Sequence, residues 1–268
     1  MLIVISSTKI NDLEKIVSTE TGKLVEDFER YFNVVFADTE QLKREVYGVR
    51  YRVYCEEFNY EATDLFPDKL ETDEYDDISM HCLITHKASG KSAGCVRLVP
   101  APQPQPDFLL PLEKYCDDSI DKQFVKDLHL NRQKECELSR LAVDQTFRRR
   151  PGEHMSRFGS LTALDVSENE QRTFPLIAIS AFVAAIALTD LCGRNSVFAM
   201  MEPFLPRLLT RSGIHFVRSG RDVDYHGIRA PYFLDAHAED TVSNDLKPLY
   251  FWIKNQLQVG FNAQANLA

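Results

Sequence analysis

Glu135-Cys-Glu-Leu-Ser-Arg-Leu-Ala-Val-Asp144 is the stretch that decides the fold of this 268-residue chain. Its apolar residues are typical of a strand in a core, yet Glu137 and Arg140 carry charges within it. In a strand, Glu137 and Ser139 lie on one face. Moving a carboxylate out of water is costly unless the carboxylate is paired or used in chemistry. The stretch therefore predicts a core strand that carries a functional acid.

The residues that follow, Gln-Thr-Phe-Arg-Arg-Arg-Pro-Gly-Glu at 145–153, form a basic segment that contains a glycine. An acid-bearing strand thus leads directly into positive charge. Backbone N–H groups of such a loop, together with the N-terminus of a following helix, can bind phosphate. This order suits a site in which a base works beside a phosphate-bearing donor.

The composition limits the class of protein. With 44% apolar residues, the chain has enough material for one substantial core, and we expect a single domain over 1–268 with an accessory N-terminal segment (1–30) and a C-terminal tail (240–268). A net charge of −9 argues against nucleic acid as a partner. The six cysteines form no CxxC pair and lack a zinc-type His spacing, so we expect no metal site. Free thiols, together with the lack of a signal-peptide pattern, favour the cytoplasm.

Hydrophobic periodicity and turn residues predict the order of the elements. The expected strands are 33–37, 78–86, 92–100, 135–143, 196–201, 214–218 and 230–234. The expected helices are 21–32, 40–58 with Thr39 as its N-cap, 155–166, 174–188 and 202–211. The turn at 87–91 makes a hairpin of the strands on either side of it.

An acidic segment, Glu61–Asp77, carries eight acidic residues against one lysine. One interpretation is a loop in solvent; the other is that Asp73 and Asp76 return to basic side chains of the core. Arg97 lies in the second hairpin strand, and a buried arginine requires a carboxylate partner. Glu137, Asp73 and Asp76 are the candidates.

Two further segments stand out. Phe174–Leu188 is almost wholly apolar but, at fifteen residues, too short to span a bilayer comfortably. It predicts a buried helix, with peripheral contact with a membrane as the alternative. Ala101–Pro106 has alternating prolines and cannot form regular structure, so it begins a long connection of the kind that often covers a site.

The element order is that of the GNAT acyltransferase fold, an α/β (α+β) architecture with a central mixed, mostly antiparallel sheet flanked by helices. The motifs extend the resemblance to acyl-homoserine lactone synthases. The matching stretches are Arg50-Tyr-Arg-Val-Tyr54 with Tyr60, Asp73-Glu-Tyr-Asp76, Gly94-Cys-Val-Arg97-Leu and Glu137-Leu-Ser-Arg140. Over most of its length the chain is most similar to the acyltransferase of PEP-CTERM/exosortase systems, a group that also resembles long-chain N-acyl amino acid synthases. Tyr60 stands where the lactone synthases have Trp, which argues against S-adenosylmethionine as the acceptor.

The resemblance implies an enzyme, an N-acyltransferase that transfers a fatty acyl chain from acyl carrier protein or acyl-CoA to a small-molecule amine, with no bound cofactor. The implied catalytic residues are Glu137, Arg140 and Ser139. The implied acceptor pocket and ion cluster consist of Arg50, Tyr54, Tyr60, Asp73, Asp76 and Arg97. The implied donor-binding residues are Val143, Phe147, Arg148, Arg149, Arg150 and Gly152. The alternatives are an autoinducer synthase, a protein of the same fold that binds acyl chains without turnover, and an ion cluster that touches no substrate.

The basic residues after the strand also bear on the partner. Arg148–Arg150 and Arg157 are opposed nearby only by Glu153. Acyl carrier proteins are acidic, and opposite charge raises encounter rates, so this segment favours docking of acyl carrier protein. Contact with coenzyme A phosphates and a basic turn in solvent are the alternatives.

Overall fold

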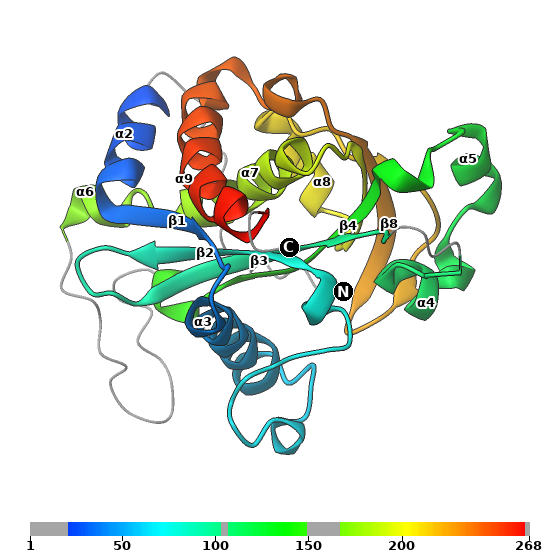
Figure 1. The fold of residues 1–268 in the computed structure, drawn as a ribbon, viewed down its shortest axis with the longest axis horizontal. Helices are drawn as coiled ribbons and strands as arrows, with labels where there is room; N and C mark the ends of the chain where they lie inside the picture. Colours follow the sequence, from blue (N-terminus) through cyan, green and yellow to red (C-terminus); the bar gives the residue numbers. More distant parts are fainter. Residues whose placement is uncertain (1–20, 103–106, 149–166, 266–268) are drawn as a thin grey trace.

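A computed structural model describes residues 21–102, 107–148 and 167–265, and its centre is one sheet (Figure 1). The strand order is β1-β2-β3-β4-β5-β8-β6, with β7 added to β8 outside that path. The strands are β1 (Phe32–Phe36), β2 (Met80–His86), β3 (Ser92–Pro100), β4 (Glu135–Val143), β5 (Ser196–Met201), β6 (Val217–Arg218), β7 (Val223–Asp224) and β8 (Ile228–Asp235). Neighbours pair antiparallel except β4 and β5, which run parallel. The predicted mixed, mostly antiparallel sheet is confirmed.

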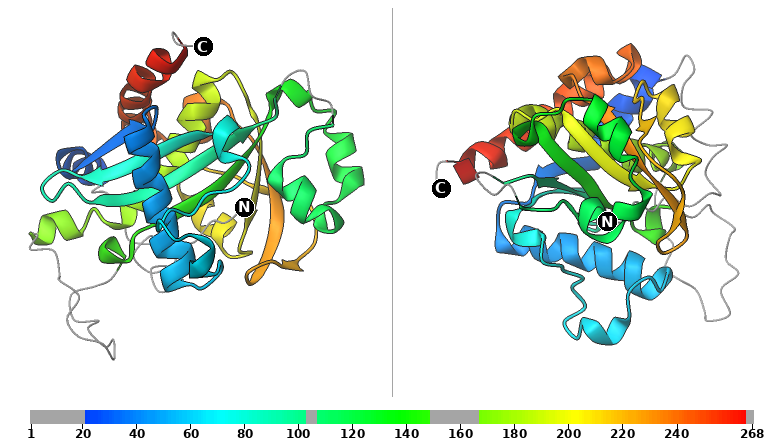
Figure 2. Two further views of the ribbon diagram at one scale, coloured as in Figure 1. Left: turned by 60° about the horizontal axis from the view of Figure 1, so that its bottom comes forward. Right: turned by 90° about the vertical axis from the view of Figure 1, so that its right-hand side faces the viewer.

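Helices cover both faces of the sheet (Figures 1 and 2). They are α2 (Thr21–Tyr31), α3 (Glu40–Arg50), α4 (Pro111–Tyr115), α5 (Lys122–Asp127), α6 (Glu168–Gln171), α7 (Pro175–Leu191), α8 (Leu205–Arg211) and α9 (Lys247–Ala265). One face packs against α7 and α9, and the opposite face packs against α3. The short α4 and α5 belong to the long connection between β3 and β4, beside the other end of the sheet.

The helix α7 is buried on all sides, which explains its apolar sequence. Every residue from Leu176 to Thr189 is buried. The helix packs on β2, β3 and β4 and is covered in turn by α9. The predicted buried helix is therefore confirmed, and the core accounts for its apolar surface. No helix within the three described ranges is long and apolar enough to cross a membrane.

The segment around α3 matches the helix predicted from the sequence at its start and differs from that prediction in its second half. The Thr39 hydroxyl accepts a hydrogen bond from the Leu42 N–H at 3.2 Å, so the predicted N-cap is confirmed. The α-helix ends at Arg50, however, and Tyr51–Glu57 forms a π-helical segment. The prediction of one regular helix to residue 58 was wrong over this half. Wider π-helical turns are common at functional sites.

A β-bulge in β4 breaks the alternation of its side chains. Cys95 pairs with Ala142 and Arg97 with Ser139, so β4 holds one extra residue between these pairs. Arg140 supplies it, with φ of 51°. As a result Leu138 and Leu141 both pack in the core on the α7 side. Ser139 and Arg140 are adjacent in the chain, yet both side chains point to the α3 side, where their partners lie.

The sheet also opens beside this bulge. The pairing of β4 with β5 covers only Glu135–Leu138, opposite Ser196–Ala199. Beyond that point β5 continues along β8, as far as the pair Met201–Ala230. The two parallel strands therefore separate where Ser139 and Arg140 begin.

Helix α9 is part of the core. The sequence predicts a C-terminal tail over 240–268 instead, so this prediction was wrong. The helix packs against α7 and β1. A Cβ at Gly260 would lie 3.1 Å from the Phe36 Cβ, so the glycine allows this close approach. Two predicted ranges were too long: α8 begins at Leu205, and only Val217–Arg218 forms a strand near 214–218.

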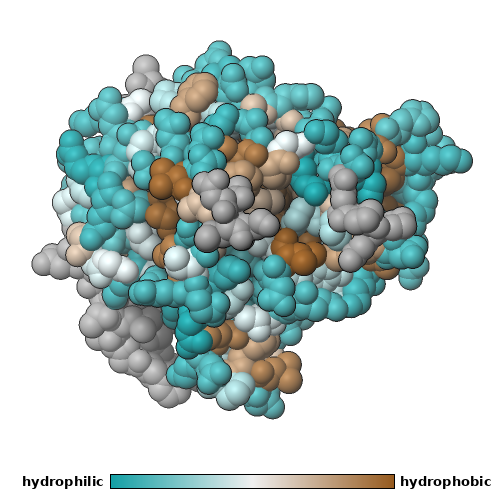
Figure 3. Space-filling model, in the orientation of Figure 1, coloured by the Kyte–Doolittle hydropathy of each residue, from teal (hydrophilic) through white to brown (hydrophobic). Residues whose placement is uncertain are grey.

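The remaining predictions concern the surface and segments outside the described residues. The face shown in Figure 3 is mainly hydrophilic, with small separate apolar areas. Cys82, Cys95 and Cys136 are buried in the core, and all six cysteines are free thiols. The segment 1–20, the prolines at 104 and 106, and the predicted helix 155–166 lie outside the described residues.

Candidate active site

Three arginines and three carboxylates form a closed ring of ion pairs on the face of the sheet that α3 covers. In order around the ring, which we call the ion ring, they are Arg50, Glu71, Arg140, Asp73, Arg97 and Asp76. The arginines lie on α3, β4 and β3, whereas all the carboxylates belong to the acidic loop before β2. The formal charges cancel, which is the condition for burying so many of them.

Arg97 holds one side of the ion ring. Its Nη1 donates to Asp73 Oδ1 at 2.5 Å and to Asp76 Oδ1 at 2.8 Å. Its Nε donates to the Ser139 hydroxyl at 3.0 Å. The two aspartates are thus the partners of Arg97, and Glu137, the third candidate, is not. Burial acts to raise the pKa values of Asp73 and Asp76, but the nearby guanidinium groups hold both pKa values well below their usual range.

Glu71 closes the other side and was missed by the sequence analysis. It is 1% exposed, bonds to the Arg50 Nε, and lies 3.0 Å from Arg140 Nη2. Burial acts to raise the pKa of Glu71, but the charges of Arg50 and Arg140 lower it to about 2. Within a segment holding eight acidic residues, nothing in the spacing distinguishes Glu71 from its neighbours.

Each arginine of the ion ring keeps one donor nitrogen unused. Among the described residues, Arg50 Nη2, Arg97 Nη2 and Arg140 Nη1 are buried and have no hydrogen-bond partner. A buried donor without a partner is costly. The charges of the ion ring therefore cancel among its own members. Its arginines still have N–H groups that can donate to further oxygen atoms.

The two predicted tyrosines have different surroundings. Tyr54 is fully buried, donates its hydroxyl hydrogen to the Leu141 carbonyl at 2.9 Å, and lies with its ring centroid 5.7 Å from the Arg140 guanidinium carbon. Tyr60 is only partly buried and stacks on Phe58, with the ring centroids 5.3 Å apart. Tyr54 thus lines the ion ring, while Tyr60 lies beside a different arginine, Arg229 of β8.

Glu137 lies outside the ion ring, in apolar surroundings. It pairs with Val99 of β3 and Phe198 of β5, and its side chain is fully buried. Its Oε2 accepts from the Leu112 N–H at 2.7 Å, one of the free N–H groups of the first turn of α4. Its Oε1 has no partner among the described residues. Burial raises the pKa of Glu137 to about 7, against the Leu112 hydrogen bond, which lowers it.

The raised pKa of Glu137 makes the stability of the folded protein depend on pH. Between about pH 4.5, the ordinary pKa, and about pH 7, the folded protein binds more protons at this carboxyl than the unfolded chain does. The stability contributed by the neutral form is therefore complete below pH 4.5 and lost as the pH rises through about 7. We expect the unfolding free energy of wild type to fall relative to Glu137→Gln by about 3 kcal/mol over this window. Urea unfolding of both proteins at several pH values measures it; a constant difference would contradict the shift.

The predicted donor-binding residues are only partly described. Val143 and Phe147 are buried, and Phe147 packs among Phe32, His86 and Phe174, so its side chain belongs to the core. Arg148 is described: its Nε donates to the Val143 carbonyl at 2.6 Å, and it pairs with Glu57. Arg149, Arg150 and Gly152 lie outside the described residues, so the basic loop stays a prediction.

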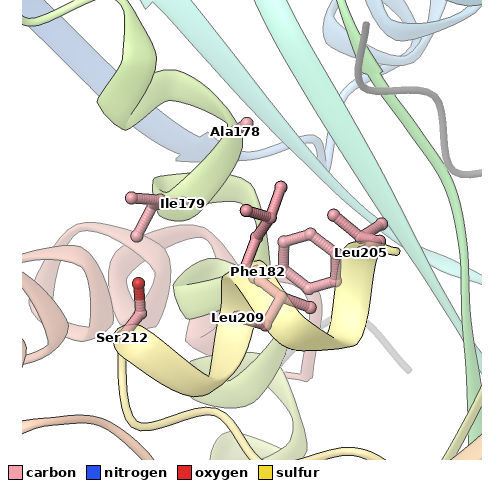
Figure 4. Close-up of a pocket in the computed structure, with 7 residues that line it drawn as sticks. Ala178, Ile179, Phe182, Leu205, Leu209 and Ser212 are labelled. Carbon is pink, nitrogen blue, oxygen red and sulfur yellow. The ribbon is translucent and has the colours of Figure 1, made fainter. Parts of the chain in front are cut away.

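An apolar pocket lies on the other face of the sheet, between α7 and α8 (Figure 4). It is lined by Ala178, Ile179, Phe182, Leu205, Leu208, Leu209 and Ser212. None of these residues belongs to the ion ring or carries a titrating group. Among the described residues, no cluster of His, Cys, Asp or Glu is arranged to hold a metal ion.

Residues 49–157 match the family model of the acetyltransferase (GNAT) domain. The fold is that of the GNAT acyltransferases. The matched span begins beside Arg50 and runs past β4, so it contains the whole ion ring and Glu137. No curated protein matches the sequence significantly.

Solved structures agree with the GNAT fold. TofI, in a complex with an inhibitor and MTA, has a TM-score of 0.54 and 19% identity over 77% of this chain and 92% of TofI. BjaI, a CoA-dependent acyl-homoserine lactone synthase with SAM and isopentyl-CoA, has a TM-score of 0.50 and 17% identity over 83% of this chain and 89% of BjaI. FeeM, an N-acyl amino acid synthase from uncultured soil microbes, is more distant, with a TM-score of 0.38 and 11% identity over 88% of this chain and 89% of FeeM.

Proposed function

We propose that this protein is an N-acyltransferase that moves a fatty acyl chain from a thioester donor to the amine of an amino acid or a similar acceptor. The observation that carries the proposal is Glu137. It is a fully buried carboxylate with a raised pKa and one unpartnered oxygen, set on β4 just before β4 and β5 separate. A base with a pKa near the working pH is the most effective one for removing a proton from an attacking ammonium or amine.

The chemistry follows from these groups. The neutral acceptor amine attacks the thioester carbonyl carbon, and Glu137 takes a proton from its nitrogen as the C–N bond forms. The C–N bond forms, the C–S bond breaks, and the leaving thiolate receives the proton that Glu137 took. The acceptor is acylated and the thiol of the donor is released. No oxidant, reductant or metal is needed for this balance.

The backbone of β4 supports the tetrahedral intermediate in this proposal. After Leu138, β4 has no pairing with β5, so its β5-facing edge is free of ladder hydrogen bonds from that strand. A backbone N–H on this edge can donate to the oxyanion that develops on the thioester carbonyl. Arg140 and Ser139 then act next to the reacting atoms through the ion ring, which fixes the acceptor pocket beside the same opening.

The donor is proposed to be acyl carrier protein or acyl-CoA, held by Arg148–Arg150 and Gly152. The structure of BjaI with isopentyl-CoA supports a thioester donor on this fold. The basic character of residues 148–150 suits either an acidic carrier protein or phosphate groups. Because the motifs of the protein resemble those of the acyltransferases of PEP-CTERM/exosortase systems, we include that association in the proposal.

A lactone synthase is the second candidate, because BjaI and TofI share this fold with SAM or MTA bound. In that case the acceptor is S-adenosylmethionine and the product cyclises after acylation. Tyr60 in place of the Trp of the lactone synthases favours a free amino acid instead.

The test is a product assay. Purified protein is incubated with a long-chain acyl carrier protein or the matching acyl-CoA, and with either a pool of amino acids or S-adenosylmethionine. Mass spectrometry of the lipid extract then identifies the product. We expect an N-acyl amino acid that depends on donor and enzyme. An acyl-homoserine lactone would support the second candidate, and acyl-donor binding without any product would contradict both.

A further inference from the structure

The turn between β7 and β8 is a fixed structure at the edge of the proposed acceptor site. Val223 pairs with Arg229, and Asp224 pairs with Ile228, which leaves Tyr225, His226 and Gly227 as the turn. The Tyr225 N–H donates to the Gly227 carbonyl at 3.0 Å. Arg229, 0% exposed, donates from Nε to the Tyr225 carbonyl at 3.0 Å and so ties the turn to β8.

The same turn docks on the segment that follows the π-helical turns. The His226 ring lies 5.4 Å from the Tyr60 ring and 4.7 Å from the Tyr225 ring, between centroids. The His226 Nε2 lies 3.9 Å from Glu61. Contacts on both sides therefore limit the positions that Tyr225 can take.

Tyr225 joins two apolar clusters that are otherwise separate. One contains Val99, Leu112 and Phe198, which surround Glu137. The other contains Tyr54, which lines the ion ring. Among the described residues, Tyr225 is the partly buried side chain that packs against both clusters. Tyr225 therefore packs against the apolar surroundings of both the proposed base and the ion ring, and its side chain is partly exposed.

The phenol of Tyr225 has the right chemistry for an anion. Burial raises its pKa to about 12, and the positive charge of Arg140 acts against that rise. Tyr225 is thus a neutral O–H donor at every working pH. Arg140 is 5% exposed, and its Nη1 is the buried donor of the ion ring that has no partner among the described residues.

We propose that Tyr225 Oη and Arg140 Nη1 together bind the carboxylate of the acceptor, so that the acceptor is a free amino acid rather than a simple amine. This inference rests on the proposed function and specifies its acceptor. Along β4, the backbones of Glu137 and Arg140 are at most about 10 Å apart, because a strand rises about 3.3 Å per residue and the bulge at Arg140 shortens the span. An amino acid with its carboxylate at Arg140 and Tyr225 can direct its amine towards Glu137.

A comparison of acids with matched amines tests this pairing. The probes are leucine with isopentylamine, phenylalanine with phenethylamine, and valine with isobutylamine. The acid with the fastest turnover supplies KM, and its decarboxylated partner is measured as a competitor. The proteins are wild type, Tyr225→Phe and, as control, Tyr31→Phe, which removes the hydroxyl of a partly buried tyrosine at the end of α2.

We expect Tyr225→Phe to raise KM for the acid about tenfold, the usual loss for a hydrogen bond to a charged group, with a smaller change in kcat. Inhibition by the amine should stay the same in both proteins, and the control should match wild type. The inference fails if the amine competes as well as the acid in wild type. It also fails if Tyr225→Phe weakens the binding of acid and amine equally, because the carboxylate then does not contribute to recognition. If wild type acylates no amine at all, the proposed function fails first.

Discussion

Glu137→Gln is expected to lower kcat about a hundredfold or more, the usual scale for removing a general base. Gln keeps the shape of the side chain and can still accept the hydrogen bond that Oε2 receives from the Leu112 N–H. It cannot take a proton from the acceptor amine. The measurement is steady-state acyl transfer at a pH above 7, with saturating donor and acceptor.

The control for this variant lies on the same strand. Glu135 is also acidic and points to the same side of β4, but it pairs with Arg132, at 2.6 Å. Glu135→Gln should therefore retain near wild-type turnover. Wild-type turnover in Glu137→Gln would remove Glu137 from the catalytic role, whatever the stability of the variant.

Arg97→Ala is expected to destabilise the fold by about 3–5 kcal/mol, since it leaves buried charge uncompensated. The change takes one of two arginine partners from each of Asp73 and Asp76, leaves the ion ring with one uncompensated negative charge, and removes the donor to Ser139. It also leaves a cavity where a fully buried arginine side chain was. Urea unfolding followed by circular dichroism at neutral pH measures the loss.

A surface arginine provides the contrast. Arg30 is 70% exposed in its side chain and lies 3.7 Å from Asp27, so Arg30→Ala should change the unfolding free energy by less than about 1 kcal/mol. If Arg97→Ala unfolded at the same urea concentration as wild type, the ion ring would contribute nothing to the fold. Its carboxylates would then have to be hydrated in solution.

Part of this site was predictable from the sequence. The apolar residues Leu138 and Leu141 are three apart in a strand whose natural period is two, and that break is the signature of the bulge at Arg140. The long-range ion pairs of Arg97 were predictable in kind, because a buried arginine requires a carboxylate. Which carboxylates it meets depends on the path of an irregular loop, and no periodicity describes such a path.

Other parts of the site had no local signal. Glu71 is one acid among eight, and only the tertiary structure selects it. Tyr225 lies more than eighty residues from Glu137 in a three-residue turn, so its position follows from the pairing of β7 with β8. Helix α9 was missed because its sequence mixes Gln, Asn and Gly with apolar residues and shows only a weak helical period. Packing against α7 and β1, rather than local preference, stabilises it.

The ion ring also implies an order in which contacts form during folding. Its arginines lie on three elements that are far apart in the chain, while its carboxylates are all within the short stretch from Glu71 to Asp76. The contact from Glu71 to Arg140 spans 69 positions, so we expect it to form after β3 and β4 have paired. Until then three positive charges stand beside a half-built core with no counterions from the protein. We therefore expect the acidic loop to complete the folded state, and the proposed acceptor site to form in that last step.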